Sequence, residues 1–294
     1  AIPRSGSLDT SDVWLETLEE GGLFLSAESA LAEAFPGLRR GLEAKALRAA
    51  DKATAHHGLV SPRPEFMDPR ANPLLLASAT RLEALGACPL RYLLRYGVQL
   101  RPPHDPALDP ERWLDPLQRG GLLHRVFERV LTGAREVGVE PANPEFLTEA
   151  LRIVTEEAEL LRAAVPVPNE VVYAHGVALL REDIRSFVDF VCEHGAPWVR
   201  LEMKFGRDDA PAVEVPVGHG SISVQGAVDR VDQDEDGLHI LDYKTGMLYG
   251  FKPESGVFNG GRRMQHVVYA EAAERLLGET VADISYVFPT ARGR

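Results

Sequence analysis

An aspartate and a lysine two residues apart, Asp242 and Lys244, stand at the end of a predicted β-strand over residues 238–244. Because side chains alternate along a strand, these two residues share one face with Leu238 and Ile240. Charges on an otherwise apolar face are costly to bury unless they are paired. A structural ion pair between Asp242 and Lys244 is the simplest explanation of this pattern.

A third charged residue, Asp229, favours a more specific explanation. It lies on a predicted strand over residues 222–231, which the turn Gln233-Asp-Glu-Asp-Gly237 joins to the strand that carries Asp242. Two carboxylates from neighbouring strands can converge on one divalent cation such as Mg²⁺, which prefers oxygen ligands. A bound metal lowers the pKa of its water and neutralises phosphate charge, while a nearby lysine holds the water or a phosphate oxygen. The hairpin therefore predicts metal-assisted chemistry on a phosphate.

The residues around these positions resemble the motifs of the PD-(D/E)xK nucleases, and in particular the RecB-like exonuclease domain at the C-terminus of bacterial helicase–nuclease subunits of the RecB and AddB type. The matching stretches, in the order of that family, are Leu85-Gly-Ala-Cys88-Pro-Leu-Arg-Tyr92, Gly120-Gly-Leu-Leu-His124, Gly226-Ala-Val-Asp229-Arg-Val-Asp232, Leu241-Asp242-Tyr-Lys244-Thr-Gly246 and Gln265-His-Val-Val-Tyr269. Each motif alone is a weak signal. Together, in this order over about residues 78–290, they are specific.

The resemblance implies a site for Mg²⁺ or Mn²⁺. Asp229, Asp242 and the backbone carbonyl of Tyr243 would be metal ligands. His124 would be a further ligand from its helix, a role that an imidazole can fill. Lys244 would be the catalytic lysine.

The resemblance also implies that Gln265 and Tyr269 support the site or contact DNA; they are four residues apart and so share one helical face. Outside this context, His124 would be an ordinary core or solvated histidine, and Gln265 and Tyr269 would be common residues of a half-buried helix. Glu202 stays open between a structural partner and a residue that supports the metal site. Asp232 is expected to begin the turn that follows.

Cys88 marks a departure from the family. The resemblance to AddB-like members implies a role for a cysteine at this position. In those proteins it joins three C-terminal cysteines, and the four thiolates hold an iron–sulfur cluster. This chain has two cysteines, Cys88 and Cys192, and Cys192 matches no motif. We therefore expect no iron–sulfur cluster in this chain.

The composition favours a reducing, cytoplasmic setting. Two cysteines are too few for a disulfide framework. No apolar run approaches the ~20 residues of a membrane span, and no basic segment followed by an apolar stretch opens the chain as in a secretory signal. Because the chain begins at Ala1 without Met, we expect it to be part of a longer protein.

The apolar periodicity predicts an α/β fold, with a central mixed β-sheet flanked by helices and an N-terminal helical region; the resemblance implies a restriction-endonuclease-like core. Strands are expected from residue 199 and at 222–231, 238–244 and 283–288. Helices are expected at 8–52, 80–86, 89–97, 120–138, 144–165, 175–194 and 263–277. Thr80 and Glu83 form a predicted capping box, and the helices at 144–165 and 175–194 carry enough polar residues to lie on the outside. We expect two parts, an N-terminal helical region and linker over residues 1–73 and a RecB-like nuclease domain over residues 74–294.

We therefore expect a metal-dependent DNA nuclease, acting as an exonuclease within a helicase–nuclease system for DNA repair and recombination. Its partner would be a helicase–nuclease subunit or a helicase region of the same parent protein; the chain has no GxxxxGK[ST] loop, so an ATPase motor would lie elsewhere. The net charge of −12 argues against indiscriminate binding of nucleic acid, although the local field of a cleft matters more than the sum. Two alternatives stay open: a non-catalytic nuclease-like scaffold that binds DNA or a partner protein, and a metal phosphohydrolase for small substrates, which is the weaker one.

Overall fold

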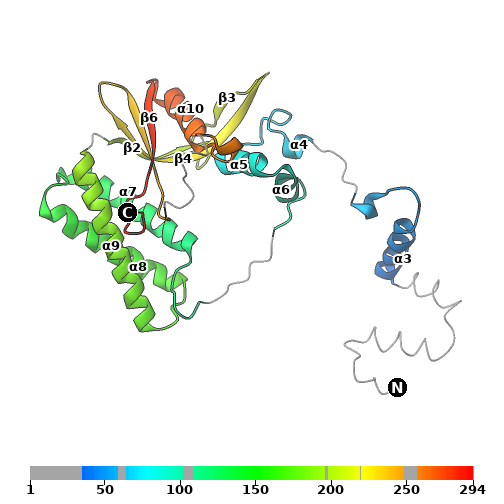
Figure 1. Cartoon of the computed structure of the whole chain (residues 1–294), viewed down its shortest axis with the longest axis horizontal. Helices are drawn as coiled ribbons and strands as arrows, with labels where there is room; N and C mark the ends of the chain where they lie inside the picture. Colours follow the sequence, from blue (N-terminus) through cyan, green and yellow to red (C-terminus); the bar gives the residue numbers. More distant parts are fainter. Residues whose placement is uncertain are drawn as a thin grey trace, which may run out of the picture. The chain divides into compact units, whose positions relative to one another are not determined.

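The computed structural model of this chain describes residues 35–58, 64–101, 109–195, 198–218, 220–247 and 257–293 (Figure 1). The chain divides into two compact units, residues 1–62 and 63–294. The helical structure expected between residues 8 and 34 lies outside the described residues. The predicted division after residue 73, into a helical region and a nuclease domain, stays a prediction.

The described part of the first unit is one helix and a short turn. Helix α3 (Pro36–Arg48) has proline in its first turn and buries none of its side chains. The 3₁₀ turn η1 (Ala55–His57) folds back on the end of α3, where His57 Nε2 lies 3.1 Å from the carbonyl oxygen of Arg48. These contacts are local, so they fix the turn against its own helix.

The second unit is built on a six-stranded mixed sheet. Its strands are β1 (Ala77–Ser78), β2 (Trp198–Phe205), β3 (Val213–Pro216), β4 (Ser221–Gln233), β5 (Leu238–Tyr243) and β6 (Val281–Val287). The long strand β4 pairs in parallel with β1 and antiparallel with β2, β3 and β5, while β5 pairs in parallel with β6. The expected α/β fold with a central mixed sheet is therefore confirmed.

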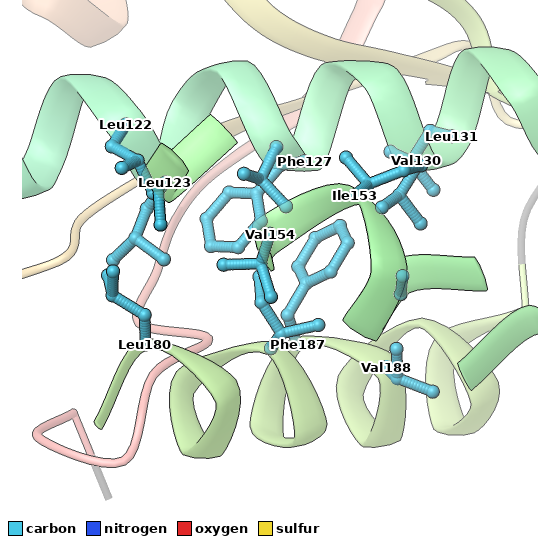
Figure 2. Close-up of a cluster of buried hydrophobic side chains, with 14 of the residues drawn as sticks. Leu122, Leu123, Phe127, Val130, Leu131, Ile153, Val154, Leu180, Phe187 and Val188 are labelled. Carbon is cyan, nitrogen blue, oxygen red and sulfur yellow. The ribbon is translucent and has the colours of Figure 1, made fainter. Parts of the chain in front are cut away.

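Three long helices, α7 (Pro116–Val137), α8 (Pro144–Ala164) and α9 (Glu170–His194), pack together in a layer with its own hydrophobic core (Figures 1 and 2). Phe127 of α7 stacks on Phe187 of α9 with ring centroids 4.0 Å apart, and Val154 of α8 lies in the same core (Figure 2). The helices after residue 144 expose a polar face, as expected, and each also buries an apolar stripe in the core that it shares with α7. Their exposed charged residues conceal that stripe in the sequence.

Helix α7 begins four residues earlier than expected. Asp115 caps it: the carboxylate accepts the N–H of Gln118 at 2.8 Å, and the Gln118 side chain accepts the N–H of Asp115 at 3.0 Å. Pro116 suits the first helical position, where its missing N–H costs nothing. His124 therefore falls in the third turn of the helix.

The sheet forms a second core with α5 (Ala79–Ala87) and α10 (Gln265–Leu277). The remaining short elements of this unit are α4 (Pro64–Met67), α6 (Pro89–Tyr92), the π-helical turn η2 (Leu93–Gly97) and the 3₁₀ turn η4 (Asn259–Gly261). In this core Val268 of α10 packs with Val228 of β4 and Ile240 of β5. The sheet thus separates two cores. No helix in the described part of the chain is long and apolar enough to cross a membrane.

Candidate metal centre

Asp229 and Asp242 lie on the two central strands, directly beyond the last pair of the β4–β5 ladder, Arg230 and Leu241. Past this pair, the backbone N–H of Tyr243 donates to Asp229 Oδ2 at 2.6 Å, so that a side chain replaces the next ladder bond. Both carboxylates are nearly buried, with 11% and 5% of the respective side chains exposed. The predicted hairpin therefore holds two acidic groups at adjacent positions of neighbouring strands.

His124 reaches Asp229 from α7. Its Nδ1 lies 3.2 Å from Asp229 Oδ1, so the two oxygens of this carboxylate are engaged from a helix and from a strand. Phe127, one turn further along α7, is buried in the helical core and fixes this part of the helix. Burial disfavours the imidazolium, but nearby carboxylates, with Asp229 first, outweigh that effect and raise the pKa of His124.

Glu202 approaches Asp229 from β2, where its flanking residues pair with those that flank Asp229 on β4. One ligand atom from each of His124, Glu202 and Asp229 lies within 4.8 Å of the other two. The backbone φ of Glu202 is 43°, in the left-handed region that strand residues avoid. Burial, and then the charge of Asp229, raise the pKa of Glu202 to about 7. The sequence alone leaves the role of Glu202 open, and its one signal is a glutamate on the polar side of an alternating strand.

A chain of polar contacts links Asp242 to α10. Lys244 forms an ion pair with Asp242 through Nζ and Oδ2, and it donates to Gln265 Oε1 at 2.7 Å. Gln265 Nε2 in turn donates to the Tyr269 hydroxyl at 3.3 Å. Burial and the nearby Asp229 raise the pKa of Asp242 to about 6, against the opposing effect of Lys244. The predicted ion pair is thus present, as one link in a longer chain of contacts.

Gly226 makes room for Tyr269. The ring of Tyr269 packs edge-on against Phe205 of β2, with centroids 6.2 Å apart and an interplanar angle of 85°. A Cβ atom at Gly226 would lie 2.6 Å from Phe205 Cζ and 3.2 Å from Tyr269 Cε1. The packing of these two aromatic rings therefore requires a glycine at position 226, the start of the β4 motif.

Helix α5 fixes the start of α10. Glu83 Oε1 accepts the backbone N–H of Met264, the residue before Gln265, at 2.8 Å. The predicted capping box of Thr80 and Glu83 is wrong, because Ser78 caps α5 by accepting an N–H of its first turn. Glu83 instead holds a segment that is distant in the sequence, and with it Gln265.

Arg230, next to Asp229, is fully buried. Its guanidinium forms a two-pronged ion pair with Asp232, at 2.6 and 2.7 Å, and lies over the ring of Trp198 at 5.2 Å from the centroid. The expectation that Asp232 begins a turn is wrong, because β4 continues to Gln233 and Asp232 neutralises the buried arginine. The sequence does not show this pair, since a charged residue near a strand end has the same pattern whether it is exposed or buried.

The seven residues predicted for the site all line one cleft of about 440 Å³. Its lining residues are His124, Asp229, Asp242, Tyr243, Lys244, Thr245, Gly246, Met247, Gln265, Tyr269 and Phe288. The ring of Tyr243 turns away into the helical core, 5.3 Å from that of Phe127. The role of its backbone carbonyl as a metal ligand stays a prediction.

The donors of this cleft, together with Glu202 beside His124 and Asp229, fit a divalent cation. Carboxylate oxygens and an imidazole nitrogen are common ligands of such ions, and the raised pKa values of Glu202 and Asp242 reflect negative charge that is crowded and poorly hydrated. The described group whose ligand atoms already lie close together is His124, Glu202 and Asp229. Asp242 stands beside this group, with its Oδ2 paired to Lys244.

Cys88 lies between α5 and α6 as an exposed free cysteine, and Cys192 on α9 is likewise exposed. The absence of an iron–sulfur cluster from this chain stays a prediction. Iron and sulfide analysis of anaerobically purified protein would measure it.

The raised pKa values of Glu202 and Asp242 predict a pH dependence of stability. Their ordinary values are 4.5 and 3.8, whereas in the folded protein they rise to about 7 and about 6. The contribution of these two carboxyls to the free energy of unfolding is therefore fully present at low pH, where both are protonated even in the unfolded chain. It is lost as the pH rises through 6 and 7 and the folded protein loses these protons. His124, whose pKa is also raised, acts in the same direction.

In the presence of a chelator, the free energy of unfolding from urea titrations should fall between about pH 5 and about pH 8. Glu202→Gln should remove much of this fall, and an unchanged fall in that variant would contradict the assignment.

Comparison of this sequence with known proteins identifies the family to which the chain is similar. The model of the PD-(D/E)XK nuclease superfamily matches residues 76–293. Three relatives, each named as a subunit of an ATP-dependent helicase/deoxyribonuclease, illustrate the likeness. The protein of Lacticaseibacillus paracasei is 26% identical in an alignment of 214 residues that covers 66% of this chain and 17% of the relative. That of Caldanaerobacter subterraneus subsp. tengcongensis is 24% identical in an alignment of 231 residues that covers 71% of this chain and 18% of the relative. That of Symbiobacterium thermophilum is 27% identical in an alignment of 228 residues that covers 70% of this chain and 18% of the relative. The chain thus spans about a sixth of the length of these relatives.

Proposed function

Because this chain belongs to the PD-(D/E)XK nuclease superfamily, we propose that it is a deoxyribonuclease that hydrolyses phosphodiester bonds with Mg²⁺ or Mn²⁺. The observation that carries this proposal is the cleft in which an imidazole, two acidic strand residues and a lysine meet, namely His124, Asp229, Asp242 and Lys244. An acidic pair with a lysine beside it supplies both a cation site and a fixed positive charge, the two features that attack on a phosphodiester requires.

His124, Asp229, Asp242 and the carbonyl of Tyr243 would hold the metal, and Glu202 lies close enough to His124 and Asp229 to add a further oxygen ligand. When bound, the ion would lower the pKa of a water and neutralise charge on the scissile phosphate. Metal binding requires these carboxyls to be ionised, so affinity should rise with pH through the raised pKa values of Asp242 and Glu202.

Lys244 would orient the attacking water and stabilise the charge that develops on the phosphate. Its ammonium is held by Asp242 on one side and by Gln265 on the other, so that it needs little reorganisation when substrate binds. Tyr269 in turn holds Gln265. We therefore assign Gln265 and Tyr269 to the support of Lys244 and to contact with DNA at the rim of the cleft.

We further propose exonuclease action within a helicase–nuclease system for DNA repair and recombination. The relatives described above support this context, since each is called a subunit of an ATP-dependent helicase/deoxyribonuclease and is about six times as long as the matched part. The partner would be a helicase–nuclease subunit or a helicase region of the same parent protein. In this proposal residues 74–294 are the nuclease domain, residues 1–73 are a helical region and linker, and the setting is the cytoplasm.

A degradation assay tests the proposal. The whole chain is incubated with end-labelled linear duplex, linear single-stranded and circular single-stranded DNA, in Mn²⁺, in Mg²⁺ and in EDTA. We expect metal-dependent release of short products from linear DNA and much slower loss of the circle. DNA that is bound but never cut, with either metal, would contradict the proposal and favour the non-catalytic scaffold. Cleavage of small phosphate esters without cleavage of DNA would favour the phosphohydrolase.

A further inference from the structure

A largely buried ion pair joins Arg119 of α7 to Asp183 of α9. Their side chains are only 12% and 2% exposed. Burying such a pair costs both charges their hydration, and the mutual attraction often does no more than offset that loss. Net stability is therefore a poor explanation for this pair, and its other contacts indicate what it holds in place.

The guanidinium of Arg119 connects Asp183 to the end of β5. Its Nη2 donates to Asp183 Oδ2, and its Nη1 donates to the backbone carbonyl of Thr245 at 2.9 Å. Thr245 is the residue that follows Lys244. Because a guanidinium is planar and rigid, its two donors hold both acceptors in one fixed geometry.

Other contacts fix the same backbone. The N–H of Lys244 donates to the carbonyl of Val287 at 2.7 Å, which ties this segment to the end of β6. Asp183 Oδ1 accepts the N–H of Ala291 at 3.2 Å, so one carboxylate holds both Arg119 and the chain that follows β6. Gly120, next to Arg119, also lies against this segment, since a Cβ atom there would be 3.1 Å from Thr245 Oγ1.

We propose that Arg119 is a positioning residue for Lys244. By holding the Thr245 carbonyl, Arg119 fixes the backbone at the point where the Lys244 side chain leaves it, and so keeps the ammonium between Asp242 and Gln265. Asp183 orients Arg119 and neutralises its charge. This inference rests on the proposed function, because the group that Arg119 positions is the one assigned to phosphate chemistry.

Arg119→Lys separates positioning from charge. A lysine keeps a positive charge for Asp183, but a single ammonium does not reproduce the two fixed directions of a guanidinium, so the Thr245 contact is lost. Small displacements of a reacting group can cost about 100-fold in rate. We expect a fall of roughly 10- to 100-fold in the single-turnover rate at saturating DNA. The DNA concentration for half-saturation and the number of Mn²⁺ sites from calorimetry should stay unchanged.

Arg129→Lys is the matched control. Arg129 lies on the same helix and pairs with Glu156 and Glu157, away from the cleft. Its cleavage rate should stay within about twofold of the unmutated chain, because Arg129 is 40% exposed and a lysine keeps a positive charge for both glutamates. A similar loss in both variants, or fewer Mn²⁺ sites in Arg119→Lys, would show a merely structural role and overturn the inference.

Hydrogen exchange supplies a readout that does not need cleavage. The amide of Lys244 is bonded to Val287, so its exchange reports how firmly this segment is held. We expect its exchange to be about tenfold faster in Arg119→Lys and unchanged in Arg129→Lys. Unchanged exchange of the Lys244 amide in Arg119→Lys would overturn the inference, whatever the cleavage rate of this variant. If the unmutated chain does not cut DNA, the proposed function fails, and this exchange still decides whether Arg119 fixes the segment.

Discussion

Lys244→Ala is expected to lose most DNA cleavage while it keeps the fold and the metal site. The ammonium lies beside Asp242 and bonds to Gln265, and three quarters of the side chain is buried. A cation is not a ligand of another cation, so its removal should leave Mn²⁺ affinity unchanged or slightly stronger. Loss of one preorganised electrostatic contact of this kind typically costs on the order of 10²–10³ in rate.

The measurement is single-turnover cleavage of a short labelled duplex, with Mn²⁺ calorimetry on the same preparation. Lys204→Ala is the matched control, because Lys204 lies on β2, is 49% exposed and pairs with Asp208 outside the cleft. Full activity of Lys244→Ala would refute the role of this lysine. Loss of metal binding together with cleavage would instead mean that Lys244 supports the carboxylates.

Asp229→Asn is expected to have the larger effect, because it removes metal binding and cleavage together. The amide oxygen of asparagine can still accept the N–H of Tyr243, so the end of the β4–β5 hairpin should remain folded. The charge of Asp229 raises the pKa values of His124, Glu202 and Asp242, so its loss changes the electrostatics of all three. Substitution of a metal-site residue commonly costs 10- to 100-fold in affinity even when it is not a direct ligand, so we expect at least about 100-fold here.

Two measurements check this prediction besides cleavage. Mn²⁺ calorimetry should show the loss of affinity, and proton NMR of the metal-free protein should show a lower pKa for His124 once its main acidic partner is neutral. Asp234→Asn is the control, since Asp234 lies in the turn of the same hairpin and pairs with His239 at 2.9 Å. Metal affinity that survives Asp229→Asn would contradict the proposed centre.

The parts of the site that the sequence predicts well are those set by local pattern. Alternation places the side chains of Asp242 and Lys244 on the same side of the chain, with Asp242 in β5 and Lys244 directly after it, and the short acidic turn brings Asp229 back beside Asp242. Likewise, a separation of four residues places Gln265 and Tyr269 on one helical face. The structure agrees with each of these arrangements.

The parts that the sequence does not predict depend on contacts between distant segments. Glu202 meets Asp229 only through the register of β2 on β4, which no local pattern records. Glu83 serves α10 and not its own helix, so its capping motif is a misleading signal. Arg230 is charged yet fully buried, because Asp232 and Trp198 surround it in three dimensions. Single-residue types cannot reveal such partners.

The sheet stands between two separate cores, and this has a consequence for local unfolding. His124 belongs to the helical layer, whereas Gln265 and Tyr269 belong to the layer that contains α10. Segments of a protein can open independently, each with its own free energy. Opening of α7 would withdraw the imidazole and leave the acidic residues without it. Opening of α10 would remove the Gln265 contact of Lys244 and leave the imidazole in place. The proposed centre is therefore complete only while both layers are closed, and the fraction of molecules in which it is complete should follow whichever layer opens more readily.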